Sequence, residues 1–93
     1  MNITGNITQE FDFEEGKEGI FSAINNFGGG TLSFEWQVSE SLWKKFMSPE
    51  LVEDFTEDIA FKFVKPVTGF NKVRIVFSGA TSPNLEVNIG LIC

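Results

Sequence analysis

One stretch of the chain decides the expected fold: it reads Thr31-Leu32-Ser33-Phe34-Glu35-Trp36-Gln37-Val38 and follows the turn Gly28-Gly29-Gly30. Apolar and polar side chains alternate along it with a period of two. Such alternation is typical of a β-strand that has one face in a core and the other face in water. The stretch therefore predicts a half-buried strand over residues 31–39.

The same alternation returns three times further along the chain, in the apolar series Ile59/Phe61/Phe63, Val73/Ile75/Phe77 and Leu85/Val87/Ile89/Leu91. Turns rich in Gly, Pro and Asn separate the expected strands at intervals of roughly ten residues. Strands at this spacing favour two antiparallel sheets packed face to face. We therefore predict an all-β fold, an antiparallel β-sandwich or jelly-roll-like domain with six to eight strands.

A short helix near residues 48–56 is the one expected exception to the β pattern. Ser48 can cap a helix, and Pro49 suits its first position. Leu51 and Phe55 are four residues apart and would share one helical face.

The length and composition indicate one domain over residues 1–93, in which residues 1–8 could form an N-terminal arm. The chain contains eleven Phe, two Trp and no Tyr. Because a phenylalanine buries a large apolar area without a polar atom, most of these rings are expected in the core. A domain this small cannot easily bury thirteen large aromatics, so the remainder could form an interface.

The charge distribution argues against two classes of partner. The formal net charge is −6, and the seven basic residues are scattered along the chain. Nucleic acids and anionic membranes both require a basic face, so neither is expected as a partner. No stretch reaches the ~18 apolar residues of a membrane span. Residues 1–5 also lack the basic and apolar regions of a secretory signal, which predicts synthesis in the cytoplasm.

The functional groups of the chain do not favour catalysis. It has no His, so the usual general base and the commonest transition-metal ligand are both missing. Cys93 alone cannot build a zinc site, and an apolar strand end explains it best. Two acidic clusters, around residues 10–18 and 53–58, favour a solvated rim. Calcium is the alternative for these carboxylates, although residues 12–15 lack the spacing of an EF-hand loop. We expect no catalytic site, no metal and no cofactor.

The two tryptophans have different expected roles. Trp36 shares the parity of Phe34 and Val38, which predicts a place in the core. Trp43 lies in an irregular stretch beside two lysines. It could be buried, or exposed as an anchor for a partner or as a platform for a sugar ring.

Two runs of the chain combine a turn with an alternating strand: Ile24-Asn25-Asn26-Phe27-Gly28-Gly29-Gly30-Thr31-Leu32-Ser33-Phe34-Glu35-Trp36 and Lys72-Val73-Arg74-Ile75-Val76-Phe77-Ser78-Gly79-Ala80-Thr81-Ser82-Pro83-Asn84-Leu85-Glu86-Val87. Together they resemble small β-sandwich proteins encoded among the structural genes of tailed bacteriophages. In those proteins a later tryptophan marks the end of the next strand, at the place of Trp43. Residues 44–58 depart from the pattern.

This resemblance implies a virion component on the outer capsid surface: a decoration, or cement, protein that binds between subunits of the major capsid protein. The alternative is a small tail or baseplate component that binds other virion proteins. An acidic chain suits the outside of a shell, because packaged DNA would repel it. A homo-oligomer is compatible with either role.

The expected binding mechanism has two parts. Residues 1–8 would lie as a strand against a neighbouring subunit, with Ile3 and Ile7 facing it. Aromatic side chains outside the core would supply the apolar anchor, and Phe27, Trp43 and Phe46 are the expected ones. A carbohydrate-binding module that uses Trp43 and an inhibitor of a host protein remain as alternatives.

Overall fold

The computed structural model describes residues 1–92, and in this range it contains nine strands and no helix. The strands are β1 (Asn2–Ile3), β2 (Ile7–Asp12), β3 (Glu18–Asn26), β4 (Thr31–Gln37), β5 (Trp43–Lys45), β6 (Asp54–Phe55), β7 (Ile59–Val64), β8 (Lys72–Ser78) and β9 (Asn84–Leu91).

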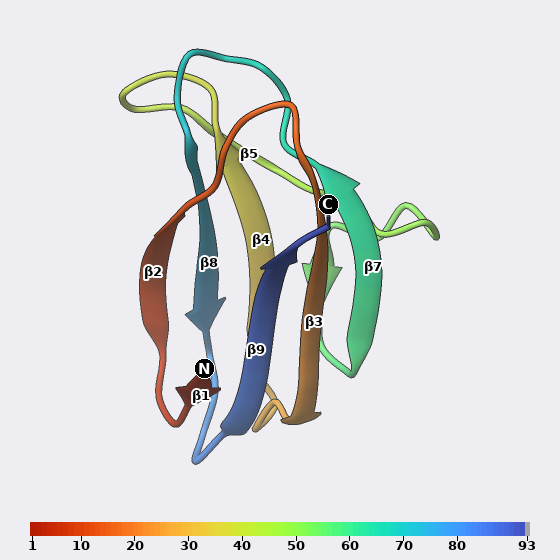
Figure 1. The fold of residues 1–93 in the computed structure, drawn as a ribbon. Coiled ribbons are helices and arrows are strands. Elements are labelled where there is room, and N and C mark those ends of the chain that lie inside the picture. Colours follow the sequence, from red (N-terminus) through yellow and green to blue (C-terminus); the bar gives the residue numbers. More distant parts are fainter. Residues whose placement is uncertain (93) are drawn as a thin grey trace.

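The strands form two antiparallel sheets that pack face to face (Figure 1). One sheet has the order β1-β9-β3-β7, and the other has the order β2-β8-β4-β5, with β6 also paired to β4. Apart from β4, β5 and β6, successive strands alternate between the two sheets. If β5 and β6 count as one interrupted strand, the arrangement is that of an eight-stranded jelly roll. The predicted all-β antiparallel sandwich is confirmed, with three very short strands raising the number to nine.

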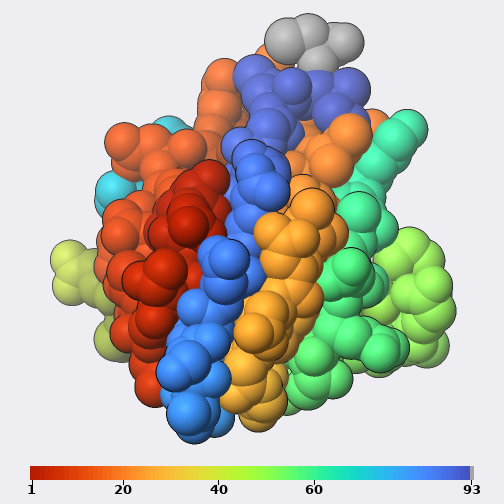
Figure 2. Space-filling model, turned by 90° about the horizontal axis from the view of Figure 1, so that it is seen from below, coloured from red at the N-terminus to blue at the C-terminus, as the bar shows by residue number. Residues whose placement is uncertain are grey.

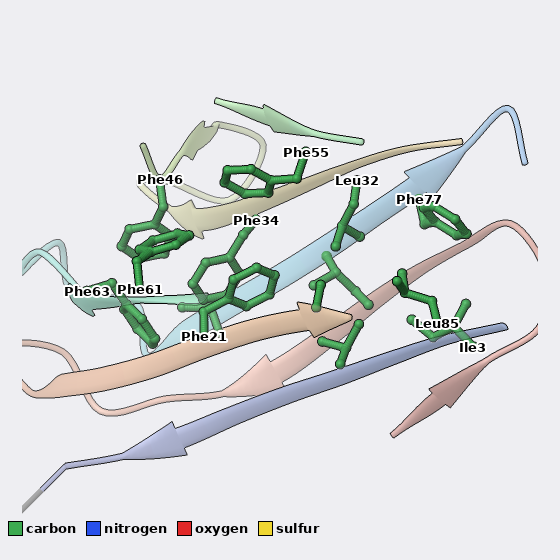
Figure 3. Packing of buried hydrophobic residues seen from close by; sticks show 14 of the residues in the cluster. Ile3, Phe21, Leu32, Phe34, Phe46, Phe55, Phe61, Phe63, Phe77 and Leu85 are labelled. Atoms are coloured by element: carbon green, nitrogen blue, oxygen red, sulfur yellow. The ribbon is translucent and has the colours of Figure 1, made fainter. Parts of the chain in front are cut away.

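Large apolar side chains fill the space between the sheets (Figure 3). Val73, Ile75 and Phe77 on β8 are all buried, as their alternation predicted. The rings of Phe21 on β3 and Phe34 on β4 stack with their centroids 4.2 Å apart, and so join the two sheets at the centre of the core. Burial of aromatic rings without polar atoms is the main stabilising contribution in a sandwich of this size.

The predicted helix near residues 48–56 is wrong, because this segment forms a tight turn followed by β6. The N–H of Leu51 donates to the carbonyl of Ser48 at 2.8 Å, and the N–H of Ser48 donates to the carbonyl of Val52 at 2.9 Å. Phe55 pairs with Leu32 on β4 and enters the core, whereas Leu51 points to solvent. A helix would place Leu51 and Phe55 on one face, so the pairing with β4 excludes it.

The first segment of the chain is divided between the two sheets rather than forming one strand. β1 pairs with β9, and after a bend at residues 4–6 the chain continues as β2, which pairs with β8. The N-terminal ammonium group donates to the carbonyl of Val87 at 3.0 Å, and the N–H of Val87 donates to the carbonyl of Met1 at 2.9 Å. Residues 1–8 therefore belong to the sandwich and are not a separate arm.

Candidate functional site

Three of the five expected binding residues lie in the core. Ile3, Phe27 and Phe46 are 3%, 5% and 7% exposed. The ring of Phe46 stacks on Phe34 at 4.5 Å between centroids, and the ring of Phe27 meets the edge of Phe77 at 6.3 Å. The expectation that Phe27 and Phe46 lie outside the core is corrected: a thin sandwich fills the space between its sheets with the large rings available.

The other two expected residues, Ile7 and Trp43, are half-buried. Ile7 lies opposite Phe77 and packs against the edge of the core. Trp43 lies on β5, where the guanidinium carbon of Arg74 is 4.3 Å from the centroid of its ring. This contact covers one side of the indole and combines apolar area with cation–π attraction. The five residues therefore do not form one continuous surface.

The outer face of the sheet β2-β8-β4-β5 carries a polar cluster centred on Glu35. Nε and Nη2 of Arg74 both lie 2.7 Å from Oε1 of Glu35, and the hydroxyl of Ser33 donates to Oε2 at 2.9 Å. Glu35 is 8% exposed, although its position in β4 points away from the core. Neighbouring side chains shield this carboxylate from water, and the hydrogen bonds from Arg74 and Ser33 stabilise its charge instead. Alternation predicted a solvent-facing Glu35 and could not reveal its partners.

A shallow depression adjoins this cluster. Its volume is about 290 Å³, and it is lined by Thr31, Ser33, Glu35, Lys45, Asp54, Val76 and Ser78. The ammonium group of Lys45 donates to Asp54 at 2.7 Å, and this hydrogen bond raises the pKa of Lys45. The depression offers hydroxyl, carboxylate and ammonium groups that could bind a small polar ligand.

A buried lysine organises the loops at one end of the sandwich. The Nζ of Lys65 donates to the carbonyl of Pro66 at 2.7 Å and to the hydroxyl of Thr68 at 2.9 Å. A carboxylate oxygen of Glu15 lies 3.9 Å away. Burial lowers the pKa of Lys65. Sequence reasoning missed this residue, although Lys65 continues the inward parity of Phe61 and Phe63.

The opposite face of the molecule carries several exposed aliphatic side chains. Figure 2 shows the segments of β1, β9, β3 and β7 side by side. On this sheet Ile20 and Ile24 of β3 and Val64 of β7 occupy outward positions, with exposed fractions of 44%, 36% and 53%. Ile20 lies opposite Lys62 in the register, so Val64 is its diagonal neighbour. Ser22 separates Ile20 from Ile24, and Ile24 lies opposite Glu86 on β9. These three aliphatic side chains are therefore exposed among polar ones, where alternation favours polar residues.

Two further findings concern metal ligands and membrane-spanning helices. Within residues 1–92 no group of three or more His, Cys, Asp and Glu side chains is placed to hold a metal ion. No helix of this part of the chain is long and apolar enough to cross a membrane. The expectation for Cys93 lies outside the described residues.

Comparisons with known proteins give no match: no family model, no curated protein and no solved structure matches this chain. Its function must therefore be argued from its own residues.

Proposed function

We propose that this protein is a non-enzymatic structural component of a bacteriophage particle, which binds between major capsid subunits on the outside of the shell. Two sequence runs, residues 24–36 and 72–87, carry the resemblance that suggests this role. The jelly roll is compatible with it, because viral capsid domains are among the proteins that use this architecture. Fold alone does not specify function, so the argument depends on the surface.

Three exposed aliphatic side chains on the outer face of the sheet β1-β9-β3-β7 are the observation that carries the proposal. Ile20, Ile24 and Val64 are exposed there, on adjacent strands. A partner that covers them gains free energy from burial of apolar area and needs no chemistry from this chain. The net charge of −6 disfavours the DNA-filled interior and so favours the outer surface.

The proposed mechanism differs from the one that the sequence suggested. β1 and β2 are both paired within the domain, and Phe27 and Phe46 support the core. Binding therefore proceeds through the face of a preformed sheet rather than through an extended arm. The free energy of binding then does not include the entropic cost of ordering a segment.

Sedimentation of an infected-cell lysate, with measurement of copy number, tests the proposal. A decoration protein migrates with a megadalton particle at on the order of hundreds of copies, as a closed symmetric shell requires. A handful of copies per particle would instead assign the chain to the tail or baseplate. Migration as a free protein would contradict both assignments.

Two variants connect this result to the proposed surface. The double variant Ile20→Lys/Ile24→Lys replaces two of the exposed aliphatic side chains with charged ones and should no longer bind the particle. Thr8→Lys is the control for a lysine added elsewhere, because Thr8 is exposed on the outer face of the other sheet. Both variants should remain folded, since all three positions point to solvent. Equal retention of the two variants on the particle would contradict the role of this face.

A carbohydrate-binding module is the second candidate, and the depression beside Glu35 is the observation that favours it. Trp43 stands half-buried on the same face, and the depression offers paired polar groups for sugar hydroxyls. Arg74 already occupies one side of the indole, which leaves only the other side for stacking. Titration with glycans, with and without calcium, tests the idea. Saturable quenching of fluorescence that Trp43→Ala removes would favour it over the virion role.

A further inference from the structure

The four outer strands of the two sheets differ in how their edges are protected. β1 has two residues and β5 has three, so each offers little edge to another strand. β2 carries Glu10 and Asp12 on its outward face, and the side-chain amide of Gln9 donates to the carbonyl of Glu10 at 3.1 Å. Short length and charge are the usual devices that prevent edge pairing. β7 has six residues and only Lys62 as a charged side chain, so it is the least protected edge.

The register shows which main-chain groups of β7 are free. The N–H of Ile92 donates to the carbonyl of Glu18 at 2.8 Å, so the main-chain groups of Glu18 face β9. Because these groups alternate in direction along a strand, those of Gly19 face β7, where Gly19 lies opposite Phe63. The odd-numbered residues of β7 therefore bond to β3. The N–H and carbonyl groups of Ala60 and Lys62 point to the open side, where the described chain places no further strand.

We propose that β7 is a homodimer interface, at which two copies of the chain pair antiparallel across a twofold axis. Ala60 lies on the axis opposite Ala60 of the second copy. Lys62 then lies directly opposite Asp58 of the second copy, and the same pair forms again on the other side of the axis. The two sheets join into one sheet in which both copies use the same surface, as a twofold interface requires.

Charge complementarity favours a second copy of this chain as the partner of β7, and it favours the register centred on Ala60. Opposite charges directly across an antiparallel pair are stabilising, and like charges are destabilising. A register centred on Lys62 would place the two lysines opposite each other. The N–H of Asn25 donates to Oδ1 of Asp58 at 3.0 Å, which holds this carboxylate at the start of β7 and leaves Oδ2 for the lysine. The methyl side chain of Ala60 allows the two strands to approach closely at the axis.

Analytical ultracentrifugation of the full chain, up to a concentration of about 1 mM so that weak association is populated, tests the proposal. The wild type should dimerise. Lys62→Glu should weaken the dimer by about tenfold or more, because it places like charges opposite each other twice. The charge exchange Lys62→Glu/Asp58→Lys should restore it. Lys44→Glu is the matched control: it makes the same charge change at an exposed site on the other sheet, and should dimerise like the wild type.

A second variant separates loss of the interface from loss of the fold. Ala60→Pro removes only an N–H that points away from β3, which an edge strand tolerates. It should be folded by circular dichroism and monomeric by ultracentrifugation. A wild type that stays monomeric throughout this concentration range would overturn the proposal. So would a dimer that Lys62→Glu and Ala60→Pro leave unchanged.

Cross-linking tests the register. In a Cys93→Ser background, Ala60→Cys should form a disulfide between copies on mild oxidation, because the Cα atoms of a directly opposed pair lie within disulfide range. Lys62→Cys should cross-link more slowly. Faster cross-linking at residue 62 would show a different register and contradict the proposed ion pairs. None of these results depends on the proposed virion role.

Discussion

Nε of Arg74 donates to Oε1 of Glu35 at 2.7 Å, and Nη2 of the same guanidinium forms an ion pair with that oxygen at 2.7 Å. The two residues lie opposite each other on the neighbouring strands β8 and β4. The guanidinium also covers the indole of Trp43 on β5. One arginine thus joins three strands on the outer face of the sheet, where sequence alternation predicted independent solvated side chains.

Removing the carboxylate should destabilise the domain. Glu35→Ala leaves the partly buried Arg74 without its partner and should lower the free energy of unfolding by about 1–3 kcal/mol. Urea denaturation measures this change. Asp12→Ala breaks the ion pair between Asp12 and Lys72, in which solvent screens both charges, and should cost much less. Equal losses for the two variants would show that the Glu35 contact is no stronger than a surface pair.

Leu51 should be a site where glycine stabilises the protein. Its φ is 63°, in the left-handed region that costs an L-residue roughly 1–2 kcal/mol, and its side chain is 74% exposed. Leu51→Gly should therefore raise the melting temperature in differential scanning calorimetry. Leu51→Ala removes the side chain but keeps the backbone strain, so it should bring little gain. A melting temperature that falls in Leu51→Gly would contradict this explanation.

Two glycines should respond differently to alanine. A Cβ at Gly19 would lie 2.7 Å from ring atoms of Phe13 and Phe63, so Gly19→Ala should destabilise the domain by about 1–3 kcal/mol through overpacking. A Cβ at Gly5 would meet nothing within 4 Å. Gly5→Ala should be neutral or stabilising by up to about 1 kcal/mol, because it restricts the unfolded chain. Thermal denaturation of both variants checks the contrast.

The first residues should contribute to stability rather than to binding alone. Ile3 is buried among the side chains of the core, so Ile3→Ala should lower the free energy of unfolding by about 2–4 kcal/mol. Ile20→Ala is the matched control, since it shortens the same side chain at an exposed position of β3. Guanidinium denaturation measures the free energy of unfolding of both variants. A cost for Ile3→Ala as small as that of Ile20→Ala would mean that residues 1–3 detach from β9 in solution.

Glu15 should make the stability depend on pH in the acidic range. The N–H groups of Thr68 and Gly69 both donate to its Oε2 at 2.8 Å, and these bonds lower its pKa below the ordinary value of 4.5. A carboxyl whose pKa is lower in the folded state contributes stability above its unfolded pKa. That contribution is lost as the pH falls through the folded pKa. Glu15→Gln should therefore lose less stability than the wild type between about pH 5 and pH 3. Parallel acid titrations monitored by tryptophan fluorescence test the difference.

The alternation of side chains along single strands explains why the inward faces of the strands were predicted correctly. The inward faces of β4 and β8 follow from a period of two, because successive side chains of any strand point to opposite sides. The helix near residues 48–56 failed for a complementary reason. Its local signals, Ser48 and Pro49, are real, but Ser48 closes a turn, and Phe55 gains more from pairing with Leu32 and entering the core than from a short helix.

The binding residues were harder to predict than the strands. Phe27 and Phe46 lie in or beside irregular segments, where no period shows which side faces the core. Lys65 shares the parity of Phe61, yet a lysine at an inward position is buried only where loops distant in the sequence bring Thr68 and Glu15 around it. Such partners have no signature in a single sequence.

The sequence by itself determined the class of this protein: alternating strands, an excess of acidic side chains and no histidine. Only the tertiary structure decided which strands pair, that Ile3 closes the core against β9, that Arg74 meets Glu35, and that β7 is left at an open edge. The physical reason is that a side-chain period sets the face of each residue within its own strand. The partner of that residue is set by which distant segments together bury the most apolar area and satisfy their main-chain groups.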